Sequence, residues 1–312
     1  MHINSVIFRE LIKRGYSRDG KKRVWDVSQS KLWYLTPELV KGYLNLKRYS
    51  PYRKRVINDE VSLLQKHMPA IVEQFWRKGF NIIDLGCGEG SKAEVLIKLL
   101  PSNVKVRYCP VDVSSLLLQM AKNRVKSLRS PQVTSIKPLH EDFIESPYVL
   151  GMLRATDFQH NFALLLGETI SHYDIHEVLF KLSNTMLNDD YLIIGNGIRK
   201  GKRFVNLPKY KDPLFHQWFV HIMRGLGFED DEVAVDARFA HGRLEGFYHV
   251  LKDKTITYNG RSLHFKKNDE VIVAIQYKFF EHELKKYCAM YFSSVNFYKN
   301  KENEYSLIVC RK

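Results

Sequence analysis

The chain has 312 residues, of which 45% are hydrophobic, and this is enough to form one large globular domain or two smaller ones. No apolar run approaches the roughly 20 residues of a membrane-spanning helix, so the composition excludes a membrane-spanning protein. Residues 1–23 contain no hydrophobic signal core. We therefore expect a cytoplasmic protein with no membrane partner.

The balance of charges is strongly basic. Lys and Arg number 49 against 34 Asp and Glu, which gives a formal net charge of +15. Such a balance favours an anionic partner, for example nucleic acid, phosphate or an acidic protein. We favour the simpler interpretation of a lysine-rich surface that maintains solubility, because the sequence contains no nucleic-acid-binding module.

Several common site motifs are missing from the sequence. None of the four cysteines forms a Cys-x-x-Cys pair, so we expect reduced core residues and no zinc site at Cys87, Cys109, Cys288 and Cys310. There is no Gly-x-x-x-x-Gly-Lys-Ser/Thr motif and no Gly-x-Ser-x-Gly motif. The sequence therefore argues against a phosphate-cradling nucleotide hydrolase and a serine hydrolase.

The N-terminal part predicts helices after a basic start. Residues 1–30 are basic and polar, and they form either a flexible arm or a short strand pair over the site. An amphipathic pattern follows from Lys31, with Thr36 as helix cap, and a further helix start is expected at Ser50-Pro51. Tyr34 and Tyr52 lie near these helix starts, where they serve either core packing or the wall of a substrate pocket.

Residues 80–197 alternate strands and helices as a parallel sheet does. The strand runs are short and nearly unbroken in apolar residues, as expected when both sheet faces are covered. Ligands of such sheets lie beyond the carboxyl ends of the strands. The expected strands are 81–85, 105–111, 132–137, 161–167 and 191–196, and the expected helices are 91–100, 114–127, 145–153 and 174–187.

The pattern changes after residue 197. A helix is expected at 212–227, and residues 231–277 read as antiparallel strands with a strong hairpin signal at Asn259-Gly260. A helix at 279–291 and two closing strands that pair at the sheet edge complete the chain. We therefore predict three parts: an N-terminal segment at the substrate pocket, a Rossmann-like domain and an inserted substrate-binding module, formed by residues 1–60, 61–197 with 279–312, and 198–278.

The stretch NIIDLGCGEGSK, residues 81–92, predicts the ligand site. A strand ends at Asp84, glycines follow at Gly86, Gly88 and Gly90, and a helix opens at Ser91. The glycines permit a tight turn on which a ligand can lie, and the helix start offers free N–H groups. This pattern is typical of a nucleoside site, although a purely structural turn has the same form.

The next strand ends in an acidic residue, Asp112, followed by Val113. An acidic side chain at that place can accept both hydroxyl protons of a ribose. The Gly-x-Gly-x-Gly spacing differs from that of a dinucleotide site, so we favour a nucleoside cofactor without a pyrophosphate.

Further polar residues follow the other strand ends. Asp142 can contact an adenine amino group or serve as a turn residue. Lys92 points a cation at the site or into solvent. Gly167 opens a polar loop in which His172 orients or deprotonates a substrate group, or is a loop histidine hydrogen-bonded to the backbone. We favour a pocket-lining role over proton transfer.

The segments DLGCGEGSK, YCPVDVS, HEDF and LLLGETISHY together resemble class I methyltransferases that use S-adenosylmethionine (SAM). The resemblance is closer to the histidine Nα-methyltransferases of ergothioneine biosynthesis and their relatives, and it covers nearly the whole chain. It implies a Rossmann-like doubly wound α/β sheet with an inserted antiparallel α+β module, an N-terminal helical segment and SAM as the cofactor.

The resemblance also implies roles for individual residues. Gly86, Gly88 and Lys92 would hold the methionine part of SAM, Asp112 the ribose and Asp142 the adenine. Tyr34, Tyr52 and His172 would face the substrate. The sequence departs from the family where His172 replaces an asparagine and where Ala274 and Gln276 align with a glutamate and a serine. The resemblance is thus fuller in the cofactor half than in the substrate half.

The expected reaction is in-line transfer of a methyl group from SAM to a nitrogen of a small amino-acid-like or amine substrate. A methyltransferase that acts on RNA or a protein tail is the alternative that the net charge suggests. A SAM-binding protein without catalytic activity is a third possibility. Among the residues named, we expect His172, Tyr34 and Tyr52 at the reacting groups. The expected cofactor contacts come from Asp84, Gly86, Gly88, Gly90, Lys92, Asp112, Val113, Asp142 and Gly167.

Overall fold

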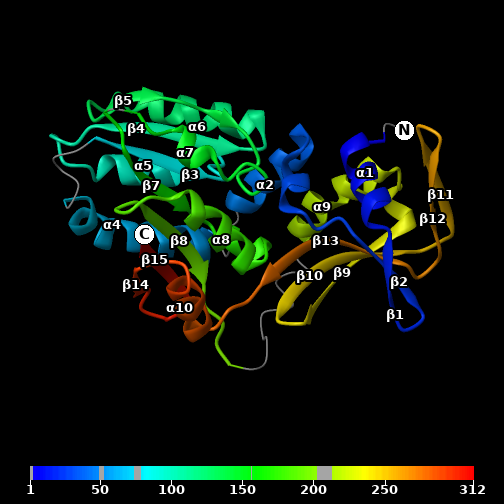
Figure 1. Ribbon diagram of the computed structural model, residues 1–312. Helices are drawn as coiled ribbons and strands as arrows, with labels where there is room; N and C mark the ends of the chain where they lie inside the picture. Colours follow the sequence, from blue (N-terminus) through cyan, green and yellow to red (C-terminus); the bar gives the residue numbers. More distant parts are fainter. Residues whose placement is uncertain (1–2, 49–52, 74–78, 156, 202–212) are drawn as a thin grey trace. The chain divides into compact units, whose positions relative to one another are not determined.

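The computed structural model describes residues 3–48, 53–73, 79–155, 157–201 and 213–312 (Figure 1). The chain divides into two compact units, one formed by residues 1–49 and 201–278 and the other by residues 50–200 and 279–312. The N-terminal segment and the insertion, which the sequence analysis treats as two parts, thus share the first unit. The expected helix start at Ser50-Pro51 lies outside the described residues.

The second unit contains an eight-stranded, mostly parallel sheet, as expected. Its strand order is β14-β15-β8-β7-β3-β4-β5, and the short β6 pairs with β4. β3, β4, β5, β7 and β8 run parallel, whereas β15 is antiparallel to β8 and to β14. The strands are β3 (Phe80–Leu85), β4 (Val106–Asp112), β5 (Val133–Ile136), β6 (Leu139–His140), β7 (His160–Leu165), β8 (Tyr191–Gly197), β14 (Ser294–Lys299) and β15 (Tyr305–Arg311).

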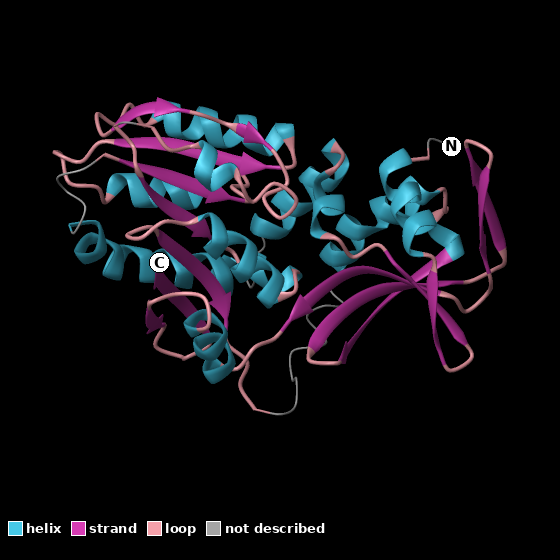
Figure 2. Cartoon of the chain, in the orientation of Figure 1, coloured by secondary structure: helices cyan, strands magenta, loops and turns pink. Residues whose placement is uncertain are grey.

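Helices alternate with these strands along the chain (Figure 2), which confirms the predicted α/β pattern. All six residues of β3 are buried, as the unbroken apolar runs predict. One core cluster packs α4 and α5 against alternate residues of the parallel strands, among them Ile82, Tyr108 and Phe162. The helices of this unit are η2 (Arg53–Asn58), α4 (Asp59–Val72), α5 (Ser91–Lys98), α6 (Ser115–Ser127), α7 (Val149–Met152), η4 (Thr169–His172), α8 (Ile175–Thr185) and α10 (Glu281–Ala289).

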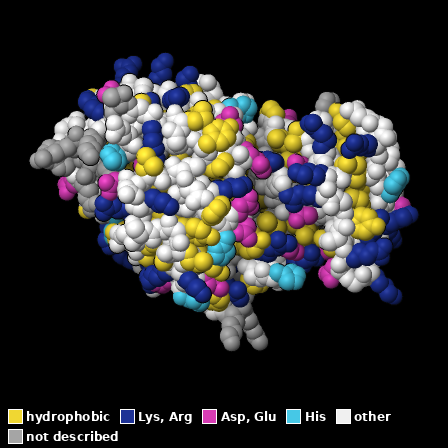
Figure 3. Space-filling view, in the orientation of Figure 1, with side chains coloured by type: hydrophobic (Ala, Val, Ile, Leu, Met, Phe, Trp, Pro, Cys, Tyr) yellow, Lys and Arg dark blue, Asp and Glu magenta, His cyan; other side chains and the backbone are white. Residues whose placement is uncertain are grey.

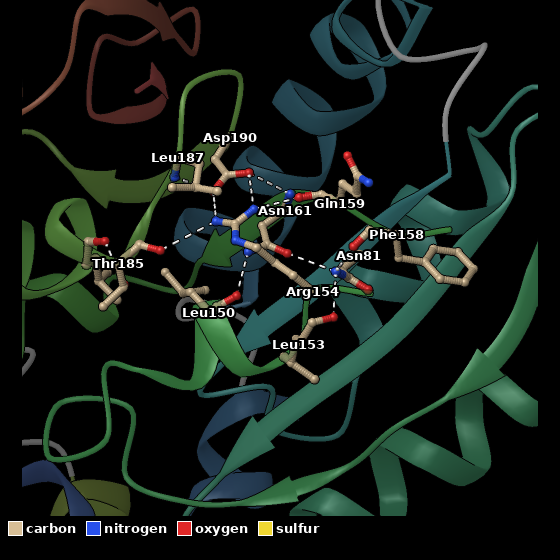
Figure 4. Close-up of polar contacts among 11 residues, drawn as sticks. Asn81, Leu150, Leu153, Arg154, Phe158, Gln159, Asn161, Thr185, Leu187 and Asp190 are labelled. Atoms are coloured by element: carbon tan, nitrogen blue, oxygen red, sulfur yellow. Dashed lines mark hydrogen bonds and ion pairs between the residues drawn. The ribbon is translucent and has the colours of Figure 1, made fainter. Parts of the chain in front are cut away.

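A buried polar network fixes the amino ends of the central strands (Figure 4). Asp190, just before β8, forms an ion pair with Arg154 and accepts a 2.8 Å hydrogen bond from the Asn161 backbone. The Asn81 side chain donates a hydrogen bond to the Asn161 side chain at 2.9 Å, so the first residues of β3 and β7 are joined. Because the strands are parallel, their carboxyl ends meet at the opposite edge of the sheet, which leaves that edge available for a ligand.

The first unit holds a five-stranded sheet in the order β1-β2-β13-β10-β9 and a separate hairpin of β11 and β12. Asn259 and Gly260 form the hairpin turn with φ of 48° and 73°, which confirms the sequence signal. β2 and β13, from opposite ends of the chain, pair in parallel. The strands are β1 (Tyr16–Asp19), β2 (Lys22–Asp26), β9 (Val233–Ala240), β10 (Arg243–Val250), β11 (Lys254–Tyr258), β12 (Arg261–Phe265) and β13 (Glu270–Tyr277).

The N-terminal residues form a helix and then a strand pair. Of the two interpretations of residues 1–30, the strand pair is correct, since β1 and β2 form a hairpin. The preceding helix was not predicted, although Asn4 caps it by accepting the N–H of Val6 at 3.0 Å. Thr36 caps α2 as expected, accepting the Leu39 N–H at 3.4 Å. The helices of this unit are α1 (Ser5–Arg14), η1 (Ser30–Tyr34), α2 (Pro37–Arg48), α9 (Pro213–Leu226) and η6 (Asp230–Glu232).

All four cysteines are buried and unpaired, as expected for reduced core residues. Within the described residues, no helix has the length and apolar character needed to cross a membrane. The same part of the chain contains no group of three or more His, Cys, Asp or Glu side chains that could hold a metal ion.

Candidate cofactor site

The turn after β3 has the backbone conformation that its glycines predict. Gly86, Gly88 and Gly90 have φ of 66°, 53° and 76°, a region that other residues adopt at a cost. The N–H groups of Gly86 and Cys87 both donate to the Val111 carbonyl, at 2.9 and 3.1 Å. The turn is therefore fastened to the end of β4, beside Asp112.

The three glycines have different surroundings. A Cβ atom at Gly86 would be in ordinary van der Waals contact with Thr169 at 3.7 Å and Phe143 at 3.8 Å, and Gly86 itself is exposed, so its main chain is accessible. At Gly90 a Cβ atom would lie 2.9 Å from the Cα atom of Ala121 in α6. Gly90 thus permits both the turn and the close packing of the α5 start on α6, and α5 begins at Ser91 as predicted.

Asp112 closes the turn through its carboxylate. One oxygen accepts the N–H of Gly88 at 3.0 Å, and the other accepts the N–H of Ser114 at 2.9 Å. Burial raises the pKa of Asp112 to about 6, against the opposing effect of these two hydrogen bonds and of nearby His140. Each carboxylate oxygen has two lone pairs. Oδ2 also accepts a weak, 3.9 Å hydrogen bond from the Cys87 thiol, whereas Oδ1 retains capacity to accept a further hydrogen bond.

Asp84 is the most deeply buried acid of the turn. Tyr108, from β4, donates its hydroxyl to Asp84 at 3.0 Å. Burial raises the pKa of Asp84 to about 7, while the Tyr108 hydrogen bond and the charge of Lys92 oppose the rise. With Glu89, three buried carboxyl groups surround the glycine turn: Asp84, Glu89 and Asp112.

Lys92 and Gly167 lie together, and a buried glutamate contacts both. A Cβ atom on Gly167 would be 2.5 Å from Lys92 Nζ, so the glycine, with φ of 79°, admits the ammonium group. Glu60 of α4 forms an ion pair with Lys92 and accepts the Gly167 N–H at 2.8 Å. The α5 start and the carboxyl end of β7 are thereby joined at the ligand edge of the sheet.

Asp142 and Val113 lie in loops after the first strands. Asp142 accepts the N–H of Ile144 at 3.0 Å, which is the turn role that the sequence allows. The Val113 carbonyl accepts a 2.8 Å hydrogen bond from His140 Nε2. Phe143, next to Asp142, faces Gly86 as described above. The contacts of Asp142 and Val113 with a cofactor remain predictions.

The expected substrate residues are divided between the two units. His172 ends η4 and is half-buried in the second unit, in the same turn as Thr169, which neighbours Gly86. Tyr34 belongs to the first unit, where its ring centroid lies 5.2 Å from that of Tyr43 and 5.9 Å from that of Trp218. This contact fits core packing, and a substrate role of Tyr34 remains a prediction. Tyr52 lies outside the described residues.

Sequence reasoning did not identify Glu60 or Tyr108 as site residues. Glu60 stands in the pair Asp59-Glu60 at a helix start, where acidic residues are common, so the sequence carries no signal of its burial. Tyr108 lies in the mostly apolar strand β4, so its position predicts a core side chain. Both become visible only through their partners on other elements.

A model of the family described as histidine-specific methyltransferase, SAM-dependent, matches residues 41–312. The chain belongs to this family. It is therefore a SAM-dependent methyltransferase, and its cofactor is SAM. No curated protein matches the chain.

Solved structures with a similar chain course are distant in sequence. A sugar N-methyltransferase from a Streptoalloteichus species is 11% identical, with a TM-score of 0.43, over 87% of this chain and 93% of its own. A protein from Pyrococcus horikoshii is 14% identical, with a TM-score of 0.43, over 85% of this chain and 93% of its own. These likenesses are too distant to carry an argument, so the family rests on the match over residues 41–312 and the fold on the strand order.

The residues of the second unit fit SAM. Asp112 Oδ1 can accept a ribose hydroxyl, and Oδ2 can accept a second one in place of its weak contact with the Cys87 thiol. The exposed Gly86 offers main chain for the ligand to lie on. The buried acids around the turn suit a ligand that carries hydroxyl groups and positive charge. The residue-by-residue contacts are our proposal.

Proposed function

We propose that this methyltransferase transfers a methyl group to a nitrogen of a small amino-acid-like or amine substrate. The observation that carries the proposal is the match to a histidine-specific family over residues 41–312, since histidine is an amino acid with amine and imidazole nitrogens. The replacement of a carboxylate by Ala274 and of a serine by Gln276 favours an acceptor that differs from histidine at its amino-acid group.

The proposed chemistry requires little beyond binding and alignment. When bound, SAM supplies a methyl group on a positively charged sulfur, which leaves as a neutral thioether as the methyl passes in line to the nucleophile. Asp112 would hold the ribose hydroxyls, Asp142 the adenine amino group, and Lys92 the methionine carboxylate. Holding two reacting atoms in line can supply about 7–11 kcal/mol of the barrier.

His172 is the residue that we propose nearest to the accepting nitrogen. Support comes from its place in the turn that also holds Thr169, beside the accessible main chain of Gly86. An amine must be neutral to attack, so it must lose a proton before or during transfer. In this proposal His172 orients the nitrogen and receives that proton, or passes it to water.

The net charge of +15 supports the alternative of an RNA or protein-tail substrate. On the face shown in Figure 3, however, Lys and Arg side chains are spread among neutral and acidic ones and do not gather in one continuous patch. Among the described residues, some basic side chains form ion pairs, such as Lys98 with Glu94 and Lys181 with Glu177. We therefore place the small-molecule substrate first.

Product analysis tests the proposal. The protein is incubated with methyl-labelled SAM and, separately, with histidine and other amino acids, a panel of small amines, total RNA, and basic peptides. We expect labelled N-methyl products from the amino-acid or amine panel, identified by mass spectrometry. Label that appears only in RNA or peptide would replace this proposal by the alternative, and label in none of the panels would contradict both.

A further inference from the structure

Glu60 is a charged side chain in a place where charge is rarely found without a function. It is the second residue of α4, it is fully buried, and it stands within the apolar cluster formed by Leu63, Leu64 and their neighbours. Burying a carboxylate costs free energy unless several donors compensate. The donors that surround Glu60 therefore indicate what the residue is for.

Two hydrogen-bond donors and one ion-pair partner, from three different elements, converge on this carboxylate. Gly167, after β7, donates its backbone N–H at 2.8 Å, and Tyr305 of β15 donates its hydroxyl at 2.7 Å, both to Oε1. Lys92 of α5 forms the ion pair with Oε2. All three partners lie at the edge of the sheet where the proposed cofactor site lies, since Tyr305 pairs with Gly197 at the carboxyl end of β8.

Glycines make room for this arrangement on both sides. A Cβ atom at Gly195 of β8 would lie 1.7 Å from Glu60 Oε1, so only glycine allows the carboxylate to reach across the sheet end. A Cβ atom at Gly167 would lie 2.5 Å from Lys92 Nζ. The packing therefore holds the carboxylate and the ammonium group in one place.

We propose that Glu60 is a positioning residue for the amino-acid part of the cofactor. A lysine side chain is long and has many rotamers, so an unrestrained Lys92 would lose this freedom each time it bound a ligand carboxylate. Glu60 holds Lys92 beforehand through the ion pair, and the ammonium group, with its three protons, can still donate to a ligand carboxylate. It also fixes the Gly167 turn. This inference rests on the proposed cofactor contacts of Lys92 and deepens them.

The test compares two ligands that differ only in the part that Lys92 would hold. S-adenosylhomocysteine carries the amino-acid group, whereas methylthioadenosine has the same nucleoside and thioether without it. Calorimetric titration gives the dissociation constant of each for the wild type and for Glu60→Gln. We expect Glu60→Gln to weaken S-adenosylhomocysteine about tenfold, or about 1.4 kcal/mol, and to change methylthioadenosine by less than about threefold.

Two further variants separate positioning from stability. Glu94→Gln, on α5, breaks the ion pairs of Glu94 with Lys98 and Arg124, neither of which involves Glu60. It should leave the ratio of the two ligand affinities unchanged. In a Lys92→Met background, Glu60→Gln should no longer change that ratio, because the residue acts through Lys92.

The outcomes are distinct. Equal weakening of both ligands by Glu60→Gln would make Glu60 a structural residue only, and an unchanged or tighter S-adenosylhomocysteine complex would show that Glu60 does not prepare Lys92 for the ligand. Each result overturns this inference. Failure of the wild type to bind either ligand would instead refute the proposed cofactor site itself.

Discussion

Replacing Asp112 with alanine should weaken SAM binding strongly, and it should also destabilise the fold. The carboxylate is proposed to accept two ribose hydroxyls, and hydrogen bonds to a charged group contribute about 1.5–3 kcal/mol each. Their loss predicts a dissociation constant raised at least about 100-fold, since each 1.4 kcal/mol is about tenfold. The N–H groups of Gly88 and Ser114 would both lose their partner, at 3.0 and 2.9 Å, so the unfolding free energy should also fall, by about 1–3 kcal/mol for each group.

Isothermal calorimetry with SAM and denaturant unfolding measure the two effects separately. Ser114→Ala is the matched control, because it removes the hydroxyl that accepts the Leu117 N–H at 3.4 Å at the start of α6 and leaves the Asp112 carboxylate in place. This control should change SAM affinity by less than about threefold. An Asp112→Ala protein that binds SAM as the wild type does would refute the placement of the ribose, and an equal loss in the control would assign the effect to α6.

Three further predictions concern the glycine turn after β3 and the proposed substrate residues. Burial raises the pKa of Asp84 to about 7, above its unfolded value of about 3.9. The folded state therefore binds the proton more tightly than the unfolded state. This contribution to the unfolding free energy is fully present below about pH 4 and is lost as the pH rises through about 7. The unfolding free energy of Asp84→Asn should therefore rise relative to that of the wild type between pH 4 and 7. A difference between the two proteins that stays constant over this pH range would contradict the argument. Gly90→Ala should lower the unfolding free energy by about 1–3 kcal/mol, because φ is 76° and the new Cβ atom would lie 2.9 Å from the Cα atom of Ala121. An unchanged denaturation midpoint would contradict this prediction and show that α6 can shift to accommodate the methyl group. His172→Ala and Tyr52→Ala should each lower turnover in a product assay, by up to about 10²–10⁴-fold, while SAM affinity in calorimetry stays the same. If a variant loses turnover and SAM affinity together, the replaced residue is structural.

Much of the second unit could be predicted because its signals are local. Short apolar runs, only Ile82-Ile83 in β3 and longer ones in β4, β7 and β8, set these strands, and glycine torsions set the turn after β3. The hairpin at Asn259-Gly260 was predictable for the same reason. Helix α1 was missed because its basic residues hide the apolar stripe of Ile7, Phe8 and Leu11.

The sequence by itself determined the alternation of strands and helices in the parallel sheet, the glycine turn and the acidic residue at the end of β4, since each depends on neighbours a few positions apart. Tertiary structure alone decided that Glu60 contacts Gly167, 107 positions away, and Tyr305, 245 positions away. It also decided that β2 pairs with β13. Contacts of this kind arise when distant segments pack into one core, and the types of the separate residues carry no record of the partner that burial will give them.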